Sequence, residues 1–225
     1  MAKSKNEMRT YYNERAEEYD EIYEGKKHGT LDPHIYLKDV ARTAERASRF
    51  GSGHLLDIAC GTGFWLLSYY RNCRRITVVD QSKKMLQKCK KRAAEKGVKL
   101  IDFVQGDFLD IMFKPSTFDS VFVGFLLSHF TLDQEKTFFR NLEQILKPDS
   151  QVMLVDSAWN RIRQRYTEKE CMQERVLNDG RAYTVYKRYF EKQDIMRMCD
   201  RYHLTLQSGF TGTAFIVAVL NQRKP

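Results

Sequence analysis

Apolar runs of strand length alternate with helical segments through the middle of the chain, and this alternation constrains the fold most. Runs that indicate strands cover residues 54–59, 75–80, 100–105, 118–125 and 151–156. Segments that indicate helices lie between them, at 64–72, 82–96 and 133–146. Strands that alternate with helices through short connections form a parallel sheet with right-handed crossovers. The sequence therefore predicts a doubly wound α/β fold.

The alternation lapses after residue 156. A helical pattern returns at 191–202, and two β-like runs, 204–208 and 214–220, then form an antiparallel hairpin through a short turn. We therefore expect an α/β domain over 51–225 with an insert at about 158–190. The segment before it, 1–50, has two helical stretches, at 6–24 and 33–50. We expect this segment to cover the ligand face as a lid.

Composition excludes several classes of protein. The chain has 225 residues, a net charge of +9 and five scattered cysteines with no C-x-x-C pair, which argues against a disulfide framework and a zinc site. It has no apolar run of the ~18 residues that a membrane span needs, and its first ten residues lack a signal-peptide pattern. We therefore expect a cytoplasmic protein. The charge permits an anionic partner, with basic clusters at 83–99 and at Arg161, Arg163 and Arg165.

A Gly-x-Gly turn follows the first strand. Gly61 and Gly63 let the backbone approach a ligand closely, and the helix that begins near Phe64 offers free N–H groups. A dinucleotide site would need a third glycine where Leu66 stands. Asp57 would also repel a pyrophosphate, so the turn favours a ligand that carries a cation.

Acidic residues also follow the second and third strands. Asp80 can accept both hydroxyls of a ribose. Asp107 can accept the exocyclic amine of adenine, and Phe108 offers its backbone N–H and ring face. S-adenosylmethionine would use all of these groups, with its ammonium and sulfonium near Asp57.

Five motifs in order resemble those of the class I (Rossmann-like) S-adenosylmethionine-dependent methyltransferases of small-molecule type. They are LLDIACGTG at 55–63, VVDQS at 78–82 followed by Met85-Leu86, Gly106-Asp107-Phe108, FDSV at 118–121, and Leu146-Lys147-Pro148. The resemblance is close over 51–157 and looser in the C-terminal hairpin. It implies a mostly parallel seven-stranded sheet of order 3-2-1-4-5-7-6, with strand 7 antiparallel and helices on both faces. It also implies S-adenosylmethionine as methyl donor, S-adenosylhomocysteine as product, and no metal.

The resemblance and the turn chemistry together give a set of expected cofactor-binding residues. They are Tyr12, Arg15, Tyr19, Asp57, Ala59, Cys60, Gly61, Gly63, Asp80, Gln81, Met85, Asp107, Phe108, Gly124 and Phe125. Ala59 stands where the family often has glycine. Tyr12, Ala16 and Tyr19 share one helix face, and similar segments in small-molecule methyltransferases, including those resembling quinone-biosynthesis enzymes, fold over the cofactor. Arg15 is then a candidate for the cofactor carboxylate. The alternative is an amphipathic helix that packs its aromatic residues on the core.

The substrate side is less defined. His129, after the fourth strand, is a candidate general base or a structural histidine. The insert has a turn signal at 178–180, followed by a strand-like run with aromatic residues on both faces. Such a strand could pack on the core with one face and form a pocket with the other, for a flat or anionic substrate. The expected substrate residues are Asp156, Trp159, Tyr183, Tyr186 and Arg188.

Three functions remain open at this point. The first is a methyltransferase acting on a small molecule by in-line displacement, with oxygen favoured as acceptor, then carbon, sulfur or nitrogen. The second is an RNA or protein methyltransferase, which the excess of basic over acidic residues favours. Against it, the fourth strand lacks an Asn/Asp-Pro-Pro-aromatic motif, and no cysteine follows it. The third is a non-catalytic protein that binds S-adenosylmethionine.

Overall fold

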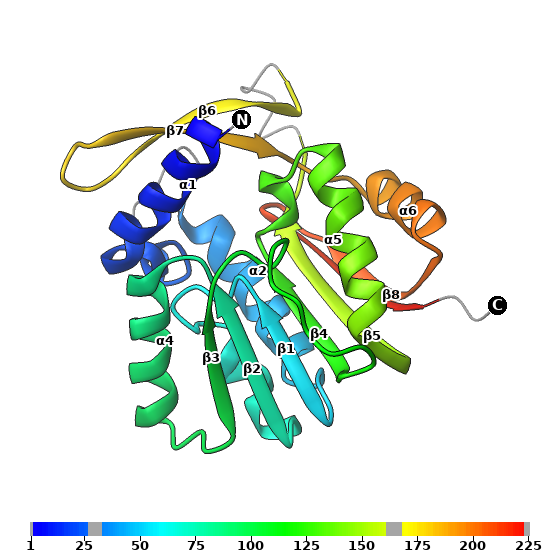
Figure 1. The fold of residues 1–225 in the computed structure, drawn as a ribbon. Coiled ribbons are helices and arrows are strands. Elements are labelled where there is room, and N and C mark those ends of the chain that lie inside the picture. The colour runs from blue at the N-terminus through cyan, green and yellow to red at the C-terminus, as the bar shows by residue number, and fades with distance from the viewer. Residues whose placement is uncertain (1, 27–32, 161–167, 223–225) are drawn as a thin grey trace.

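A computed structural model describes residues 2–26, 33–160 and 168–222. Its main sheet has the order β3-β2-β1-β4-β5-β9-β8, with β9 antiparallel to both neighbours (Figure 1). The strands are β1 (His54–Ile58), β2 (Arg75–Asp80), β3 (Ile101–Gln105), β4 (Phe118–Gly124), β5 (Leu146–Ser157), β8 (Leu204–Thr211) and β9 (Phe215–Gln222). A separate hairpin, β6 (Glu170–Val176) and β7 (Ala182–Arg188), lies in the insert. With this hairpin left out of the count, the order is 3-2-1-4-5-7-6, which confirms the predicted topology.

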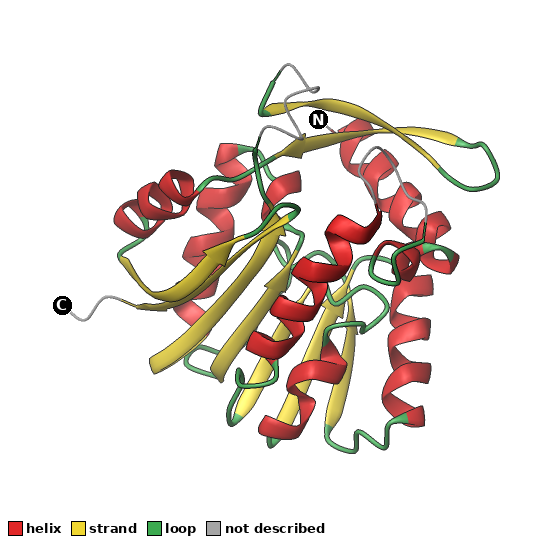
Figure 2. Ribbon diagram, turned by 180° about the vertical axis from the view of Figure 1, so that it is seen from behind, coloured by secondary structure: helices red, strands yellow, loops and turns green. Residues whose placement is uncertain are grey.

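Helices cover both faces of the sheet (Figure 2). The longer ones are α1 (Ala2–Glu14), α2 (Pro33–Ala47), α4 (Lys83–Glu95), α5 (Leu132–Ile145) and α6 (Lys192–Arg201). Short turns are α3 (Leu66–Tyr69), η1 (Arg15–Glu17), η2 (Tyr19–Ile22), η3 (Tyr70–Asn72) and η4 (Leu127–His129). The sheet has an apolar core on each of its faces, and alternate residues of β4 point into opposite cores. Val121 and Val123 pack with α5 and α6, and Phe122 packs with α2, α3 and α4. Within the described residues, no helix is long and apolar enough to cross a membrane.

Two predicted helices have different bounds in the structure. The helix expected over 64–72 begins only at Leu66 and divides into α3 and η3, because Gly61 and Gly63 hold the preceding loop at positive φ. The helix expected over 6–24 ends at Glu14, and two 3-10 turns follow it. There, Asp20 binds Thr62 and Arg92, and this contact holds η2 against the glycine turn.

The N-terminal segment and the insert hairpin lie side by side across the carboxyl ends of the parallel strands (Figure 1). Glu7 accepts a hydrogen bond of 2.9 Å from the backbone N–H of Thr184, and Glu18 accepts one of 2.8 Å from that of Asn178. We call residues 2–22 together with the β6–β7 hairpin the cover. The predicted turn at 178–180 joins its two strands.

Candidate functional site

A cavity lies under the cover at the carboxyl ends of β1, β2 and β4. It encloses about 570 Å³ of free space, including its mouth. Its lining residues are Met8, Arg9, Tyr12, Tyr19, Ala59, Gly61, Asp80, Gln81, Ser82, Met85, Gly124, Phe125, Leu126 and His129. The fold thus brings most of the residues expected at the cofactor together with the proposed catalytic histidine.

The turn after β1 is held in a left-handed backbone conformation. Ala59, Gly61 and Gly63 have φ of 61°, 55° and 75°. A Cβ on Gly61 would lie 3.3 Å from the ring of Tyr19, and a Cβ on Gly63 would lie 2.7 Å from Cys89 Sγ. Gly61 therefore allows close approach of the cover, and Gly63 allows close packing of α4.

Asp80 forms a wall of the cavity and organises the turn. Its Oδ2 accepts from Gly61 N at 2.9 Å, and its Oδ1 accepts from Ser82 N at 2.8 Å. Burial raises the pKa of this carboxyl to about 6, although both backbone donors act to lower it. At neutral pH the group is an ionised acceptor that faces the cavity.

Asp57 lies beneath the turn rather than in the cavity wall. The Tyr69 hydroxyl donates to its Oδ2, while its buried Oδ1 has no hydrogen-bond partner within the described residues. Burial raises the pKa of this carboxyl to about 7. A buried acceptor without a partner costs free energy, and a cationic ligand group placed above it would recover that cost.

Three other expected cofactor residues are not among those that line the cavity. Cys60 is buried beside the turn. Asp107 accepts from Leu109 N at 3.0 Å and so caps its own turn. The ring of Phe108 packs in the core, 5.3 Å from that of Phe138, so only the backbone of this residue can serve a ligand.

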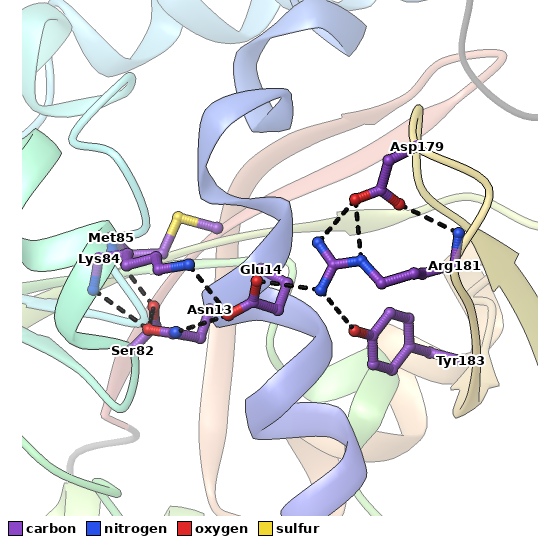
Figure 3. Close-up of polar contacts among 8 residues, drawn as sticks. All are labelled: Asn13, Glu14, Ser82, Lys84, Met85, Asp179, Arg181 and Tyr183. Atoms are coloured by element: carbon purple, nitrogen blue, oxygen red, sulfur yellow. Dashed lines mark hydrogen bonds and ion pairs between the residues drawn. The ribbon is translucent and has the colours of Figure 1, made fainter.

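The C-terminal end of α1 fixes the cover to the sheet domain. Asn13 Oδ1 accepts from Ser82 Oγ at 3.0 Å and from Lys84 N at 3.2 Å, so it shares the N-terminus of α4 with Ser82 (Figure 3). Glu14 bridges Lys84, at 2.9 Å, and Arg181 of the hairpin, at 3.1 Å. One turn of α1 thus joins α4 to the hairpin.

Arg15 does not line the cavity. Its guanidinium stands over the rings of Tyr11 and Tyr19, at 5.6 Å and 5.2 Å from their centroids. Tyr12 and Tyr19 do line it. Part of this segment therefore also agrees with the alternative prediction, in which its aromatic residues pack within the protein and do not bind the cofactor.

His129 has a defined tautomer. Its Nδ1 lies 2.8 Å from the carbonyl oxygen of Tyr186, which can only accept, so Nδ1 carries the proton. Its Nε2 then accepts from the Tyr12 hydroxyl at 2.6 Å. Burial and the charge of Lys187 hold the histidine pKa well below its usual value, and burial raises the pKa of Tyr12. Both groups are neutral at physiological pH.

None of the expected substrate residues lies in the lining of this cavity. Asp156 accepts from Ser128 N at 2.9 Å and Ser157 N at 2.7 Å, so it caps a turn. Trp159 packs on Tyr189, and Tyr183 packs on Tyr11. Tyr186 offers its carbonyl to His129.

Arg188 lies outside the cavity because its side chain turns towards α5. It pairs with buried Glu135 and donates to the Leu127 carbonyl at 3.0 Å.

Sequence reasoning missed several lining residues. Met8, Arg9 and Leu126 carry no motif that could have marked them. Ser82 was identified as part of the VVDQS motif and as the start of the helical segment 82–96, but not as a cofactor residue; in the structure it also caps α4. Within the described ranges, no group of acidic, histidine or cysteine residues could hold a metal ion.

Comparison with protein families matches residues 55–149 to a methyltransferase domain. Demethylmenaquinone methyltransferase of Lactococcus lactis subsp. lactis (strain IL1403) is 28% identical over 52% of this chain and 47% of its own length. The chloroplastic 2-phytyl-1,4-beta-naphthoquinone methyltransferase of Arabidopsis thaliana is 27% identical over 69% of this chain and 59% of its own length. The chain thus spans about half the length of the curated relatives that it matches.

Solved structures share the fold over nearly the whole chain. The structure described as the DhpI-SAM-HEP complex is 24% identical, covers 97% of both chains and has a TM-score of 0.78. The 1,6-didemethyltoxoflavin-N1-methyltransferase of Burkholderia thailandensis, solved with bound 1,6-didemethyltoxoflavin and S-adenosylhomocysteine, is 13% identical with a TM-score of 0.66. It covers 99% of this chain and 90% of its own. The domain match and the shared fold confirm the resemblance seen in the five motifs.

Proposed function

We propose that this chain, which has the class I S-adenosylmethionine-dependent methyltransferase fold and carries a methyltransferase domain at 55–149, transfers a methyl group to a small-molecule acceptor. The observation that carries the proposal is the cavity under the cover. Its walls combine the Gly-x-Gly turn after β1 with the carboxylate of Asp80 after β2. Ligands of open parallel sheets bind at these strand ends.

The residues present fit S-adenosylmethionine. Asp80 would accept the ribose hydroxyls, and the partnerless oxygen of Asp57 would face the cationic end of the ligand. Gly124 and Phe125 would lie along its methionine part, and the backbone N–H of Phe108 would serve adenine. Of the remaining predicted cofactor residues, Tyr12, Tyr19, Ala59, Gly61, Gln81 and Met85 line the same cavity.

When bound, S-adenosylmethionine supplies an electrophilic methyl carbon on a sulfonium. The protein's own contribution is alignment, since an in-line displacement gains most from holding the acceptor in a near-attack geometry. Tyr12 and Tyr19 line the cavity, and the ring of Tyr19 lies against Gly61. His129 holds Tyr12 in place through Nε2.

The covered cavity favours a small acceptor over a polynucleotide. Part of the basic cluster at 83–99 is used within the protein, because Lys84 and Lys88 of α4 pair with Glu14 and Glu17 of the cover. The second basic group, at 161, 163 and 165, lies outside the described residues. The quinone methyltransferases among the relatives indicate a small, flat acceptor as one candidate class.

Two measurements test the proposal. Titration calorimetry with S-adenosylmethionine should give saturable binding, and methyl-labelled cofactor with a cell extract should label a low-mass product whether or not ribonuclease is added. Label that ribonuclease removes would support an RNA methyltransferase. Binding without transfer to any fraction would support a non-catalytic protein. A cytoplasmic location stays a prediction, which cell fractionation would test.

A further inference from the structure

The Tyr12–His129 pair lies in the lining of the cavity. Tyr12 comes from the cover, and His129 comes from the turn η4 that follows β4. Asp80, the residue proposed for the ribose, ends β2, and β1 lies between β2 and β4 in the sheet. Phe125 and Leu126, which precede η4, line the cavity as well. The pair therefore lies on the β4 side of the cavity, where we expect the methionine part of the cofactor.

Two hydrogen bonds fix the position of each proton in this pair. Nδ1 of His129 donates to the Tyr186 carbonyl at 2.8 Å, so Nε2 accepts from the Tyr12 hydroxyl at 2.6 Å. The hydroxyl uses its one proton in this bond and makes no other hydrogen bond within the described residues. The Tyr12 oxygen therefore keeps acceptor capacity for a ligand in the cavity that its side chain lines.

The arrangement is that of a group activated for proton transfer. Such sites place a hydroxyl within hydrogen-bond reach of a base, and a third group orients the base. Here the base is His129, and the Tyr186 carbonyl orients it through Nδ1. The same carbonyl would stabilise the imidazolium that forms when Nε2 takes up a proton. An acceptor hydroxyl that donates to the Tyr12 oxygen would thus be joined to His129 through one phenol.

The surroundings of the pair favour a neutral acceptor that is weakly acidic. Met8, one helical turn before Tyr12, and Leu126 add apolar side chains to the lining. Because burial and nearby cations hold the pKa of His129 well below its usual value, this histidine is a weak base. A weak base takes a proton more readily from a phenol or an enol than from an aliphatic alcohol, and a phenol also matches the acidity of Tyr12.

We propose that Tyr12 and His129 relay a proton from a neutral, phenol-like hydroxyl of the acceptor, whose oxygen receives the methyl group. The inference rests on the proposed methyltransferase function and names its acceptor class. The acceptor oxygen forms the new O–C bond, and the electron pair of the breaking C–S bond returns to sulfur. The acceptor proton passes to the Tyr12 oxygen, and the Tyr12 proton passes to Nε2 of His129.

The net charge of the site does not change in this step. The imidazolium of His129 gains one positive charge as the sulfonium loses one, and the products are a methyl ether and a thioether. A nearby positive charge disfavours the protonated form of a histidine. His129 therefore becomes a stronger base as the methyl group leaves, and it returns its proton to solvent once the product has left.

The chemistry of the labelled product tests the acceptor class. With methyl-labelled S-adenosylmethionine and the low-mass fraction of a cell extract, the product should be a methyl ether. It should survive mild alkali and release labelled methyl bromide with boron tribromide. Release of label by alkali, as from an ester, or resistance to both treatments, as for a C-methyl product, would overturn the inference while leaving methyl transfer intact. No transfer by the wild type would overturn the proposed function itself.

Variants separate proton transfer from attachment of the cover. In His129→Gln the amide oxygen can still accept from the Tyr12 hydroxyl, but it cannot take up the proton. Tyr12→Phe removes both roles. Each variant should lower the saturated rate of labelling by about 10²- to 10⁴-fold, and His129→Gln should keep the wild-type cofactor Kd in titration calorimetry. Tyr70→Phe, whose hydroxyl binds only exposed Arg71 among the described residues, is the matched control and should change neither.

Two outcomes would contradict the relay. A labelling rate that stays within about threefold of wild type in His129→Gln would mean that the histidine only accepts a hydrogen bond from Tyr12. Equal losses of rate and cofactor affinity in this variant would mean that the pair only attaches the cover.

Nitrogen NMR of protein with ¹⁵N-labelled histidine tests the pair without turnover. The signals of His129 are those that His129→Gln or Tyr12→Phe changes and Tyr70→Phe leaves in place. In wild-type protein, with and without S-adenosylhomocysteine, Nδ1 of His129 should be protonated and Nε2 should not. The Nε2 signal should shift in Tyr12→Phe. A protonated Nε2, or an Nε2 signal that does not change in Tyr12→Phe, would overturn the proposal.

Discussion

Ionisation of Asp80 should control the affinity for S-adenosylmethionine. Its carboxylate accepts from the backbone N–H groups of Gly61 and Ser82, at 2.9 and 2.8 Å, and it faces the cavity. The pKa of this group is raised to about 6, so the fraction ionised falls roughly tenfold between about pH 7 and pH 5. Because only the ionised form accepts both ribose hydroxyls while keeping both backbone bonds, affinity should fall by about the same factor over this range.

Asp80→Asn tests this reasoning directly. The amide offers one oxygen to two backbone donors, so one N–H faces the amide NH₂ group. In the complex a ribose hydroxyl then lacks an acceptor as well, and this unmatched donor costs about 1–3 kcal/mol, which corresponds to roughly 10- to 100-fold weaker binding near pH 8. The variant should also lose the decline in affinity below about pH 6.

Calorimetric titration of S-adenosylmethionine from about pH 5 to pH 8 measures both effects. Asp102→Asn, which removes a carboxylate from an exposed ion pair with Arg75, should bind like the wild type. If the wild-type affinity is constant over this range and Asp80→Asn binds equally well, then Asp80 does not hold the cofactor ribose.

Three further predictions concern stability. Gly63→Ala should lower the free energy of unfolding in urea by about 1–3 kcal/mol more than Gly180→Ala does. A Cβ at Gly63 would lie 2.7 Å from Cys89 Sγ, whereas Gly180 has open space at a similar positive φ. Equal losses for the two variants would contradict the packing role of Gly63. In cofactor-free protein, Asp57 has a pKa of about 7, against about 3.9 when unfolded, so the folded state binds more protons between these values and stability falls as pH rises through them. Asp57→Asn should abolish that slope and stabilise the protein near pH 8 by up to about 4 kcal/mol, and a variant whose urea-unfolding stability keeps the wild-type pH dependence would refute the assignment. Glu135→Ala should cost about 3–5 kcal/mol in thermal unfolding, since its buried carboxylate pairs with two arginines, and a loss below about 1 kcal/mol would mean that this cluster is strongly hydrated.

The sheet could be predicted from sequence because its parallel strands are covered on both faces. Phe118–Gly124, for example, is an almost continuous apolar run, and such a run has few alternatives to a buried strand. The Gly-x-Gly turn and Asp80 were also identifiable, because the chemistry of the turn requires those residue types at the strand ends.

The cover could not be predicted as well. Alternation in 182–188 marks two faces of a strand but not which face turns inward, and a shift of one residue exchanges them. Arg188 was expected at the substrate, whereas the buried inner face carries Lys187. The end of α1 at Glu14 depends on contacts between Asp20, Thr62 and Arg92, which are distant in sequence.

Transfer of label from methyl-labelled S-adenosylmethionine is the most direct test of the central claim. Purified protein, labelled cofactor and a cell extract would be incubated with and without ribonuclease, and the label would be followed into low-mass and macromolecular fractions. The account predicts label in a low-mass product, equal in both samples and absent when the protein is omitted. Label confined to RNA or protein, or no transfer despite cofactor binding, would contradict it.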